Sequence, residues 1–425
     1  MKRILLLFVF LILSLNAENI YPLSDFKGSE GYVNTKGEWV IKPKFKVAGF
    51  FSNSDSANVA VDLGFDGIKW GTIDKTGKFI IKPRFDDALY FREGLAEVEI
   101  NKRYGFIDKT GKFVIKPQFD KAFPFVEGLA RVKYNKIFGF IKLGFSNGKY
   151  GFVDKTGSFV IQPQFDDGYS FRNGLAKVEI NKKWGIIDKT GKFVIKPQFD
   201  KIYRFYEGLA KVEINKKYGF IDKTGKLVIK PQFNHVVGFS EGLSAVEINK
   251  KYGFINKIGK LVIQPQFDYT DMFKKGLVRV RIKGKWGFIN KTGKLLIELK
   301  FDDAYGFAED LAKVGINKKY GFIDKTGKFV IKPQFDKAAS FNENSVVNLV
   351  IVKINGKYGV IDQKGNFVIK PLFNHIIDYS DIFYVELDNF EGYISKDGKY
   401  LTFSESELEI AIMSTKKVKK RIFTN

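Results

Sequence analysis

Ser240 is the residue whose local pattern best fits a nucleophile. Residues 238–242 read Gly-Phe-Ser-Glu-Gly and match G-x-S-x-G, in which a serine on a sharp strand-to-helix turn attacks a carbonyl carbon. The stretch is, however, one copy of a recurring Phe-x-Glu-Gly-Leu loop, and Arg92, Val126 and Tyr206 hold the same position in other copies. We therefore interpret Ser240 as a loop residue.

The glycines around the recurring Asp-Lys-Thr-Gly-Lys stretch could belong to a phosphate-binding loop. Between Gly105 and Gly111, however, five residues intervene where that motif has four. Phe113 also follows Lys112 where the motif requires serine or threonine. The spacing therefore predicts a hairpin turn.

Metal and general-base chemistry would need histidines or carboxylates that come together. The two histidines, His235 and His375, occupy the same repeat position in copies that are far apart in the sequence. Asp108 and Asp120 recur in most copies and could suggest calcium, but asparagine replaces the first of them at Asn256, which suits side chains that cap turns. We therefore expect no catalytic residue, no metal and no cofactor.

Pairs of lysines are the remaining candidate for function, because each copy of the Asp-Lys-Thr-Gly-Lys turn carries two. Stacked copies would align these lysines into a basic ridge that could contact a polyanion. The alternative is structural, since lysines on exposed strand edges prevent pairing with other chains. The candidate ridge contains Lys75, Lys78, Lys109, Lys112, Lys189, Lys192, Lys223, Lys226, Lys291, Lys294, Lys325 and Lys328.

These lysines belong to one unit that recurs about ten times. The stretch Tyr104–Asp120 is repeated without a change at Tyr320–Asp336. Units aligned on their proline follow one another at a constant step over much of the chain, as from Pro197 to Pro231 and on to Pro265. A fixed step with occasional longer ones indicates a tandem array with insertions in surface loops. The largest insertion falls within Tyr134–Lys149.

Each unit is predicted to form three strands. Apolar and polar residues alternate in Leu209–Ile214 and in Phe113–Phe119, whereas Tyr218–Asp222 is apolar or small at nearly every position, as in a covered central strand. Asn147-Gly148 predicts a two-residue hairpin, and residues 108–111 predict a type I turn with a bulge. The proline of the third strand predicts that this strand lies at a sheet edge or bends there.

The fold class is therefore all-β, with about ten three-stranded antiparallel units whose aromatic side chains pack between neighbours. We expect an open curved or superhelical stack, because ten units are many for one ring and unequal steps fit an open array; a closed β-propeller-like ring is the alternative. The predicted divisions are a signal peptide (1–17), an N-terminal lead-in (18–30), the repeat array (31–400) and a basic tail (401–425), for which a short helix is one option.

The N-terminus predicts export. Lys2 and Arg3 precede an apolar run from Ile4 to Leu15, and Ala17 supplies a small residue at the expected cleavage site. This run is short for a membrane span, and without cysteine the chain forms no disulfides. We expect a protein of the periplasm, the cell surface or the medium, without an integral membrane span after cleavage. The formal net charge of +24 favours polyanionic partners, unless it is only a solvated lysine surface.

The unit resembles the WG repeat, also called the KWG repeat, of bacterial proteins. Its aromatic-glycine pair stands at Trp70-Gly71, Trp184-Gly185 and Trp286-Gly287, with Tyr-Gly in other copies, and a Lys-x-Gly turn and an Ile-x-Pro-x-Phe stretch follow. Leu299 replaces the proline in one copy. The resemblance covers residues 30 to 400 and implies a β-rich repeat of often exported proteins, without established catalytic residues.

These observations predict an exported, non-enzymatic binding or scaffolding protein of the bacterial envelope. Its partners would be proteins or polyanions that contact an extended basic surface. The alternative is an envelope-associated enzyme with an unrecognised site, although the sequence contains no cysteine, no clustered histidines and no residue set unique to one repeat.

Overall fold

The computed structural model describes residues 19–25, 28–34, 38–51, 55–87, 89–135, 148–341, 348–379, 382–387, 390–396 and 401–403. The predicted signal peptide, most of the predicted tail (404–425) and most of the largest insertion (136–147) lie outside these residues. The described chain contains strands and one 3-10 turn, Gly64–Asp66. It contains no helix that is long and apolar enough to cross a bilayer.

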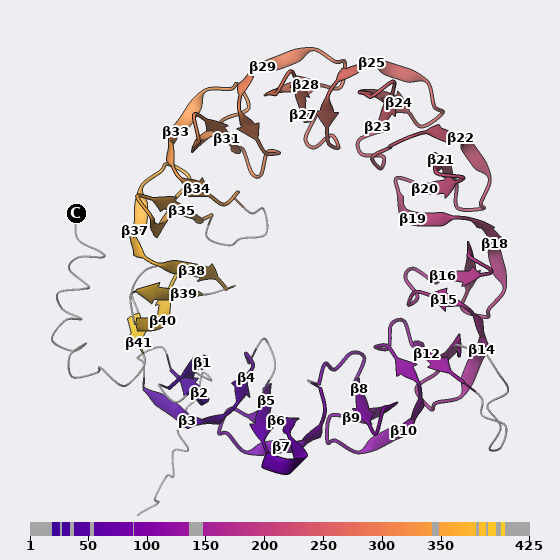
Figure 1. Cartoon of the computed structure of the whole chain (residues 1–425), viewed down its shortest axis with the longest axis vertical. Helices are drawn as coiled ribbons and strands as arrows, with labels where there is room; N and C mark the ends of the chain where they lie inside the picture. The colour runs from indigo at the N-terminus through magenta and orange to yellow at the C-terminus, as the bar shows by residue number, and fades with distance from the viewer. Residues whose placement is uncertain are drawn as a thin grey trace, which may run out of the picture.

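Eleven antiparallel sheets follow one another along the chain, and Figure 1 shows them arranged as the blades of a ring. Blade 1 contains β1 (Tyr21–Ser24), β2 (Glu30–Val33) and β3 (Trp39–Phe45). Blade 2 contains β4 (Val47–Ala48), β5 (Ser56–Asp62), β6 (Ile68–Asp74) and β7 (Phe79–Phe85). Blade 3 contains β8 (Leu95–Ile100), β9 (Arg103–Asp108) and β10 (Phe113–Phe119). Blade 4 contains β11 (Lys121–Ala122), β12 (Ala130–Tyr134), β13 (Lys149–Val153) and β14 (Phe159–Phe165), and blade 5 contains β15 (Asp167–Gly168), β16 (Leu175–Ile180), β17 (Lys183–Asp188) and β18 (Phe193–Phe199). Blade 6 contains β19 (Lys201–Tyr206), β20 (Leu209–Ile214), β21 (Lys217–Ile221) and β22 (Leu227–Phe233), and blade 7 contains β23 (Leu243–Ile248), β24 (Lys251–Asn256) and β25 (Leu261–Phe267).

Blades 8 to 11 repeat the same plan. Blade 8 contains β26 (Tyr269–Thr270), β27 (Leu277–Ile282), β28 (Lys285–Asn290) and β29 (Leu295–Phe301), and blade 9 contains β30 (Asp303–Ala304), β31 (Ala312–Ile316), β32 (Lys319–Ile323) and β33 (Phe329–Phe335). Blade 10 contains β34 (Lys337–Ala338), β35 (Val350–Ile354), β36 (Lys357–Ile361) and β37 (Phe367–Phe373), and blade 11 contains β38 (His375–Asp378), β39 (Ile382–Leu387), β40 (Phe390–Ser395) and β41 (Leu401–Phe403). The predicted three-strand unit is thus present in every blade. Eight of the described sheets have four strands, because a short strand is added at the inner edge.

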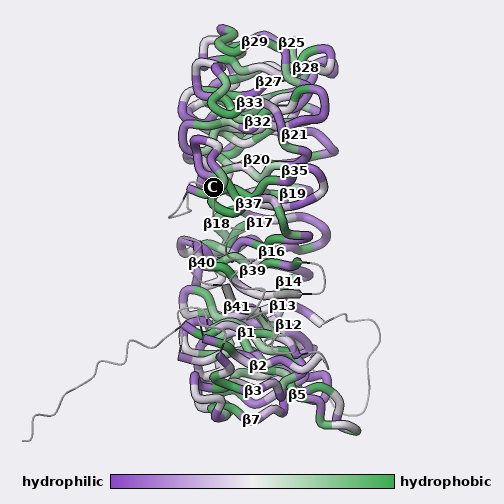
Figure 2. The backbone as a smooth tube through the Cα atoms, turned by 90° about the vertical axis from the view of Figure 1, so that its left-hand side faces the viewer, coloured by the Kyte–Doolittle hydropathy of each residue, from purple (hydrophilic) through white to green (hydrophobic). Residues whose placement is uncertain are grey.

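Each proline-containing outer strand, such as β14, lies at the edge of its sheet, as predicted. In blade 4 the order is β11-β12-β13-β14, and Figure 1 shows strands of the β14 type on the outer circumference of the ring. We call these the outer strands and those of the β11 type the inner strands. Figure 2 shows the ring from its side as a single layer of blades.

The glycine of the aromatic-glycine pair is required by a close approach of the outer strand. A Cβ atom on Gly105 would lie 2.5 Å from the carbonyl oxygen of Ile115 and 2.7 Å from the nitrogen of Pro117. The register between β9 and β10 shifts between Ile115 and Phe119, which marks an irregular, bulged stretch. The proline and the glycine therefore form one structural feature.

Neighbouring blades share each hydrophobic core. One cluster joins Phe106 and Phe119 of blade 3 to Phe125 and Val132 of blade 4. The rings of Phe106 and Phe125 have centroids 4.8 Å apart in an edge-to-face arrangement. The prediction that aromatic residues pack between units is confirmed, and a blade buries its apolar face only against its neighbours.

The ring closes between blades 1 and 11, so the alternative arrangement is the one observed in place of the preferred open stack. The hydroxyl of Tyr393 donates a hydrogen bond of 2.5 Å to the carbonyl oxygen of Pro22, and the ring of Tyr393 lies 5.5 Å from that of Tyr21. Both tyrosines belong to one core with Val33 and Ile382. The unequal steps do not open the ring: around the largest insertion, β12 and β13 keep a regular register.

Candidate functional site: the turn lysines

The turn that carries each lysine pair has a fixed geometry. Oδ1 of Asp108 accepts hydrogen bonds from the backbone nitrogen (2.8 Å) and hydroxyl (2.6 Å) of Thr110, and from the backbone nitrogen of Lys112 (3.1 Å). The Thr110 hydroxyl, above all, holds the pKa of Asp108 below its usual value. Gly111 has a φ of 85°, which favours glycine. The carboxylate therefore caps the turn.

In some blades the first lysine of a pair contacts the preceding blade. Between β17 and β18, the Nζ atom of Lys189 lies 3.4 Å from Oε2 of Glu127 and donates a hydrogen bond of 2.9 Å to the carbonyl oxygen of the same residue. The Glu127 carboxylate also accepts hydrogen bonds from the backbone nitrogens of Asn173 and Gly174 in the corresponding turn of blade 5. These backbone contacts, led by Gly174, and Lys189 lower the pKa of Glu127.

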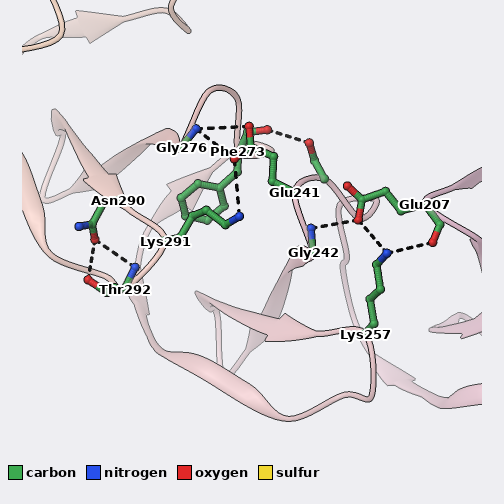
Figure 3. Close-up of polar contacts among 10 residues, drawn as sticks. Glu207, Glu241, Gly242, Lys257, Phe273, Gly276, Asn290, Lys291 and Thr292 are labelled. Carbon is green, nitrogen blue, oxygen red and sulfur yellow. Dashed lines mark hydrogen bonds and ion pairs between the residues drawn. The ribbon is translucent and has the colours of Figure 1, made fainter.

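The same arrangement recurs in later blades, as Figure 3 shows. Glu207 accepts a hydrogen bond of 3.0 Å from the backbone nitrogen of Gly242, and its Oε2 lies 3.1 Å from Nζ of Lys257. Glu241 in turn accepts a hydrogen bond from the backbone nitrogen of Gly276, and Nζ of Lys291 lies 3.9 Å from its carboxylate. We call these contacts glutamate ties, because each links three turns of two adjacent blades.

The twelve predicted ridge lysines therefore separate into two groups. Among the first lysines, Lys189 and Lys291 are held by glutamate ties, while Lys75 and Lys325 lie 3.9 Å and 2.7 Å from Asp55 and Asp310. Lys109 and Lys223 make no ion pair with any described residue. The six second lysines also form no side-chain ion pair within the described residues, and all are exposed, namely Lys78, Lys112, Lys192, Lys226, Lys294 and Lys328.

At the turn of blade 5 the formal charges balance: Lys189 and Lys192 are accompanied by the capping Asp188 and by Glu127 of the glutamate tie. Where the tie is absent, as at the turn of Lys109 and Lys112, one positive charge remains. The predicted ridge is therefore less basic than its lysines alone suggest. The polyanion role of the ridge stays a prediction.

The outer strands carry lysines that the ridge did not include. The side chain of Lys116, in β10, is exposed, and it lies on the same outward-facing row as Lys112 and Val114. No acidic residue stands in this row of blade 3. We define the basic rim as the exposed lysines Lys78, Lys82, Lys112, Lys116, Lys192, Lys196, Lys226, Lys230, Lys328 and Lys332.

The second kind of recurring aspartate, to which Asp200 belongs, follows the outer strand and connects its blade to the next one. Oδ1 of Asp200 accepts a hydrogen bond of 2.5 Å from Lys183, and Oδ2 accepts one of 2.6 Å from the backbone nitrogen of Asn215 in the next blade. Lys183, principally, lowers the pKa of Asp200. Both kinds of aspartate thus accept backbone hydrogen bonds in turns, as the sequence predicted, and the second kind also joins neighbouring blades.

The other sequence motifs are also occupied by structural contacts. The hydroxyl of Ser240 donates a hydrogen bond of 2.8 Å to the carbonyl oxygen of Phe273 in the next blade. Nδ1 of His235 lies 3.2 Å from the hydroxyl of Tyr252, and burial lowers the pKa of this histidine. His375 belongs to β38, in the last blade. Within the described part of the chain, neither histidine forms a hydrogen bond with Ser240.

Sequence reasoning missed the glutamates of the ties. Glu127 and Lys189 are separated by more than one complete repeat, so no local pattern joins them. Recurrence of glutamate in the Phe-x-Glu-Gly-Leu loop was the available signal, because a charged residue repeated in a turn usually has a repeated partner. The positive φ of Glu127, 55°, shows how tightly the loop turns at this residue.

A ring of small antiparallel sheets with shared cores defines a propeller-like repeat protein. The model for the WG-containing repeat matches ten consecutive segments of the sequence, and the chain belongs to this family. The matched segments are residues 31–59, 70–104, 104–136, 150–184, 184–218, 218–252, 252–286, 286–320, 320–358 and 358–389. A typical segment, such as 184–218, begins at the aromatic-glycine pair of one blade and ends at that of the next, so the sequence repeat spans two blades.

Solved structures with some likeness are distant. A eukaryotic initiation factor has 13% identity and a TM-score of 0.40, over 91% of this chain and 96% of that one. The extracellular domain of a putative hybrid two-component system from B. thetaiotaomicron has 10% identity and a TM-score of 0.24, over 92% and 71%. Hsv2 of Kluyveromyces lactis has 9% identity and a TM-score of 0.32, over 55% and 94%. A search of curated proteins finds no match.

Proposed function

We propose that this protein is an exported, non-enzymatic binding or scaffolding ring of the bacterial envelope that holds a polyanionic partner along its basic rim. The observation that supports the proposal most directly is the exposure of lysine pairs on the outer strands of five blades. Lysines that face solvent without a carboxylate partner lose little when they exchange counterions for phosphate or sulfate groups.

The rim is favoured over the first lysines of the ridge on electrostatic grounds. Lys189 already lies 3.4 Å from a carboxylate, so binding an anion there would compete with the glutamate tie. No carboxylate of the described residues forms an ion pair with Lys112 or Lys116, and these lysines lie about 13 Å apart along an extended strand. A long polyanion that follows the circumference can contact several such pairs together, and its affinity then depends strongly on salt.

Export is part of the proposal and rests on the N-terminal sequence. Lys2, Arg3 and the apolar run from Ile4 to Leu15 have the order of a secretory signal. Fractionation of cells that produce the full chain should recover a processed form outside the cytoplasm. An unprocessed form confined to the cytoplasm would contradict this part of the proposal.

The binding proposal is tested with two triple variants that remove the same charge. The rim variant replaces Lys116, Lys196 and Lys230 by glutamine, which the chain itself carries at the corresponding positions Gln162 and Gln264. The control variant replaces Lys155, Lys189 and Lys257 by glutamine; all three lysines lie within 3.4 Å of a tie glutamate.

Binding of the mature protein to heparin and to duplex DNA is then measured at low ionic strength. We expect salt-sensitive binding that the rim variant weakens about tenfold and the control variant changes by less than about threefold. Equal losses of affinity in the two variants would show that binding depends on net charge and not on the rim, and would contradict the proposal. If the mature protein bound neither heparin nor duplex DNA, the proposal would be overturned.

A further inference from the structure

A cavity of about 230 Å³ lies at the closure of the ring, between blades 11, 1 and 2. It lies beside the inner edge of blade 1. In blade 4, Val132 lies between two neighbouring strands. On one side it pairs with Gly151, the glycine of the aromatic-glycine pair, and on the other it pairs with Ala122 of the inner strand. In blade 1 the equivalent residue is Leu23, which is opposite Gly31 and lines the cavity. No described residue pairs with β1 on this side, so the cavity occupies the place of an inner strand.

At several other junctions the equivalent region contains a cation over an aromatic ring. Nζ of Lys313 lies 3.6 Å from the ring centroid of Tyr305 and donates a hydrogen bond of 2.8 Å to the carbonyl oxygen of Ala338 in the next blade. Lys211 and Lys177 lie in the same way over Tyr203 and Tyr169, at 4.0 Å and 4.3 Å. Each of these junctions is therefore filled by an ammonium group of the chain itself.

Blade 11 carries a tyrosine where those blades carry the cation. Lys313 pairs with Phe322 across β31 and β32, and in the same register Tyr384 pairs with Tyr393 across β39 and β40. Tyr384 lines the cavity, so an aromatic ring stands there where a lysine would fill the space. None of the described residues that line the cavity is basic, although the chain has a formal net charge of +24.

The cavity combines aromatic faces with a carboxylate. Phe50 and Tyr379 have ring centroids 4.6 Å apart, and Tyr384 and Tyr393 have centroids 5.6 Å apart. Glu30 lines the same cavity and accepts a hydrogen bond from the backbone nitrogen of Ala48, which positions its carboxylate. Burial, and after it the charge of Glu30, raise the pKa of the neighbouring Tyr32.

We propose that this closure cavity binds the ammonium group of a small organic cation, primary or quaternary, between the aromatic rings of Phe50, Tyr379, Tyr384 and Tyr393 and the carboxylate of Glu30. Aromatic faces and a carboxylate attract such a group together. The volume is below the roughly 300–1,000 Å³ of pockets for drug-sized ligands, so the site suits a head group. The proposal does not depend on polyanion binding at the rim, which involves different residues and the opposite charge.

Calorimetric titration of the mature protein with choline and with n-butylammonium tests the site directly. The neutral control is 3,3-dimethylbutan-1-ol, which has the shape of choline without its charge. We expect saturable binding of one cation per chain and binding of the neutral alcohol weaker by about tenfold or more. Equal binding of choline and the alcohol, or no binding of either cation, would overturn the proposal.

Two variants locate the binding. Glu30→Gln should weaken choline binding by about fivefold or more, and Tyr384→Lys should abolish it, because the new lysine places a cation of the chain in the cavity as in the other junctions. Glu298→Gln, which removes an exposed acid of β29, is the matched control and should change nothing. Thermal unfolding of each variant shows whether the ring remains folded. Folded Glu30→Gln and Tyr384→Lys proteins that bind choline as well as the parent would overturn the proposal.

The source of the cation is distinguished by a further titration. Phosphatidylcholine vesicles that bind the parent protein but not Tyr384→Lys would place the ammonium group on a lipid. Binding of free choline without binding of vesicles would place it on a soluble solute. Both outcomes support the site, and vesicle binding that is unchanged by Tyr384→Lys would count against it.

Discussion

Phe50 of blade 2 and Tyr379 of blade 11 are in contact, with ring centroids 4.6 Å apart. Around the closed ring, blade 1 stands between these two blades. The contact is possible because β1 has no inner neighbour among the described strands. β1 of blade 1 therefore closes the ring through Tyr21 and Tyr393, and a cavity remains beside this strand.

Closure should depend on the hydroxyl of Tyr393. The change Tyr393→Phe keeps the ring packed against Tyr21 but leaves the carbonyl oxygen of Pro22 without this donor. We expect the free energy of unfolding, measured with urea, to fall by about 1 kcal/mol. Tyr206→Phe is the control, because Tyr206 is 48% exposed. Equal stability of the parent and Tyr393→Phe would show that the hydrogen bond does not contribute to closure.

The glycine of the aromatic-glycine pair should not tolerate a side chain. Gly105→Ala would place Cβ 2.5 Å from the carbonyl oxygen of Ile115, so the outer strand must move or the bulge must open. We expect a loss of about 1–3 kcal/mol in the free energy of unfolding.

Gly306→Ala is the matched control for this change. No atom lies within 4 Å of a Cβ built on Gly306, and its φ is not positive. The control should stay within about 0.5 kcal/mol of the parent. If Gly105→Ala were as stable as Gly306→Ala, the close approach would not explain the recurring glycine.

Stability should fall in acid because of the turn aspartates. Hydrogen bonds to the charged carboxylate, led by the Thr110 hydroxyl, hold the pKa of Asp108 below its usual value of 3.8. Asp188 and Asp222 are lowered for the same reason by Thr190 and Thr224. A carboxylate with a lowered folded-state pKa contributes stability above its unfolded-state pKa, and that stability is lost as the pH falls through the folded-state value.

Urea unfolding between about pH 7 and about pH 2.5 checks this dependence. Replacing Asp108, Asp188 and Asp222 by asparagine should flatten the decline below about pH 4, because asparagine caps the turn without a titrating group. Asn290 shows that the fold accepts this residue: its Oδ1 accepts a hydrogen bond of 3.0 Å from the backbone nitrogen of Thr292. An unchanged acid profile in the triple variant would assign the decline to other carboxylates.

The buried cations between blades should be needed for packing. Lys313→Ala removes a side chain that is only 9% exposed and leaves the carbonyl oxygen of Ala338 without its donor. We expect a loss of about 1–3 kcal/mol in the free energy of unfolding. Lys337→Ala, at an exposed position of the next blade, should cost less than about 0.5 kcal/mol. Similar losses in both variants would contradict this role of Lys313.

The features predicted from the sequence are those that local spacing determines. Alternation in Phe113–Phe119 and the proline at Pro117 predict an edge strand, and the aspartate at Asp108 predicts a capped turn; all are confirmed. Most inner strands were missed because two residues, as in Lys121–Ala122, are too few to show a period. Segment 18–30, predicted as a lead-in, contains β1 of blade 1.

The relationships that depend on distance along the chain were not predictable from one sequence. Closure joins Pro22 to Tyr393, and the glutamate tie joins Glu127 to Lys189, so neither produces a local pattern. The preference for an open stack overlooked that insertions in hairpin loops leave the spacing of blades unchanged. The lysine series was visible in the sequence, but its division into tied and exposed members required the structure.

The most direct test of the account is the salt dependence of duplex DNA binding by the parent protein and by the variant with glutamine at Lys116, Lys196 and Lys230. Between about 50 and about 200 mM salt, the account predicts a steep loss of affinity for the parent, and a slope of log K against log salt that is smaller by about 0.9 for each removed lysine that contacted a phosphate. The same slope in both proteins would contradict the assignment of the polyanion surface to the rim.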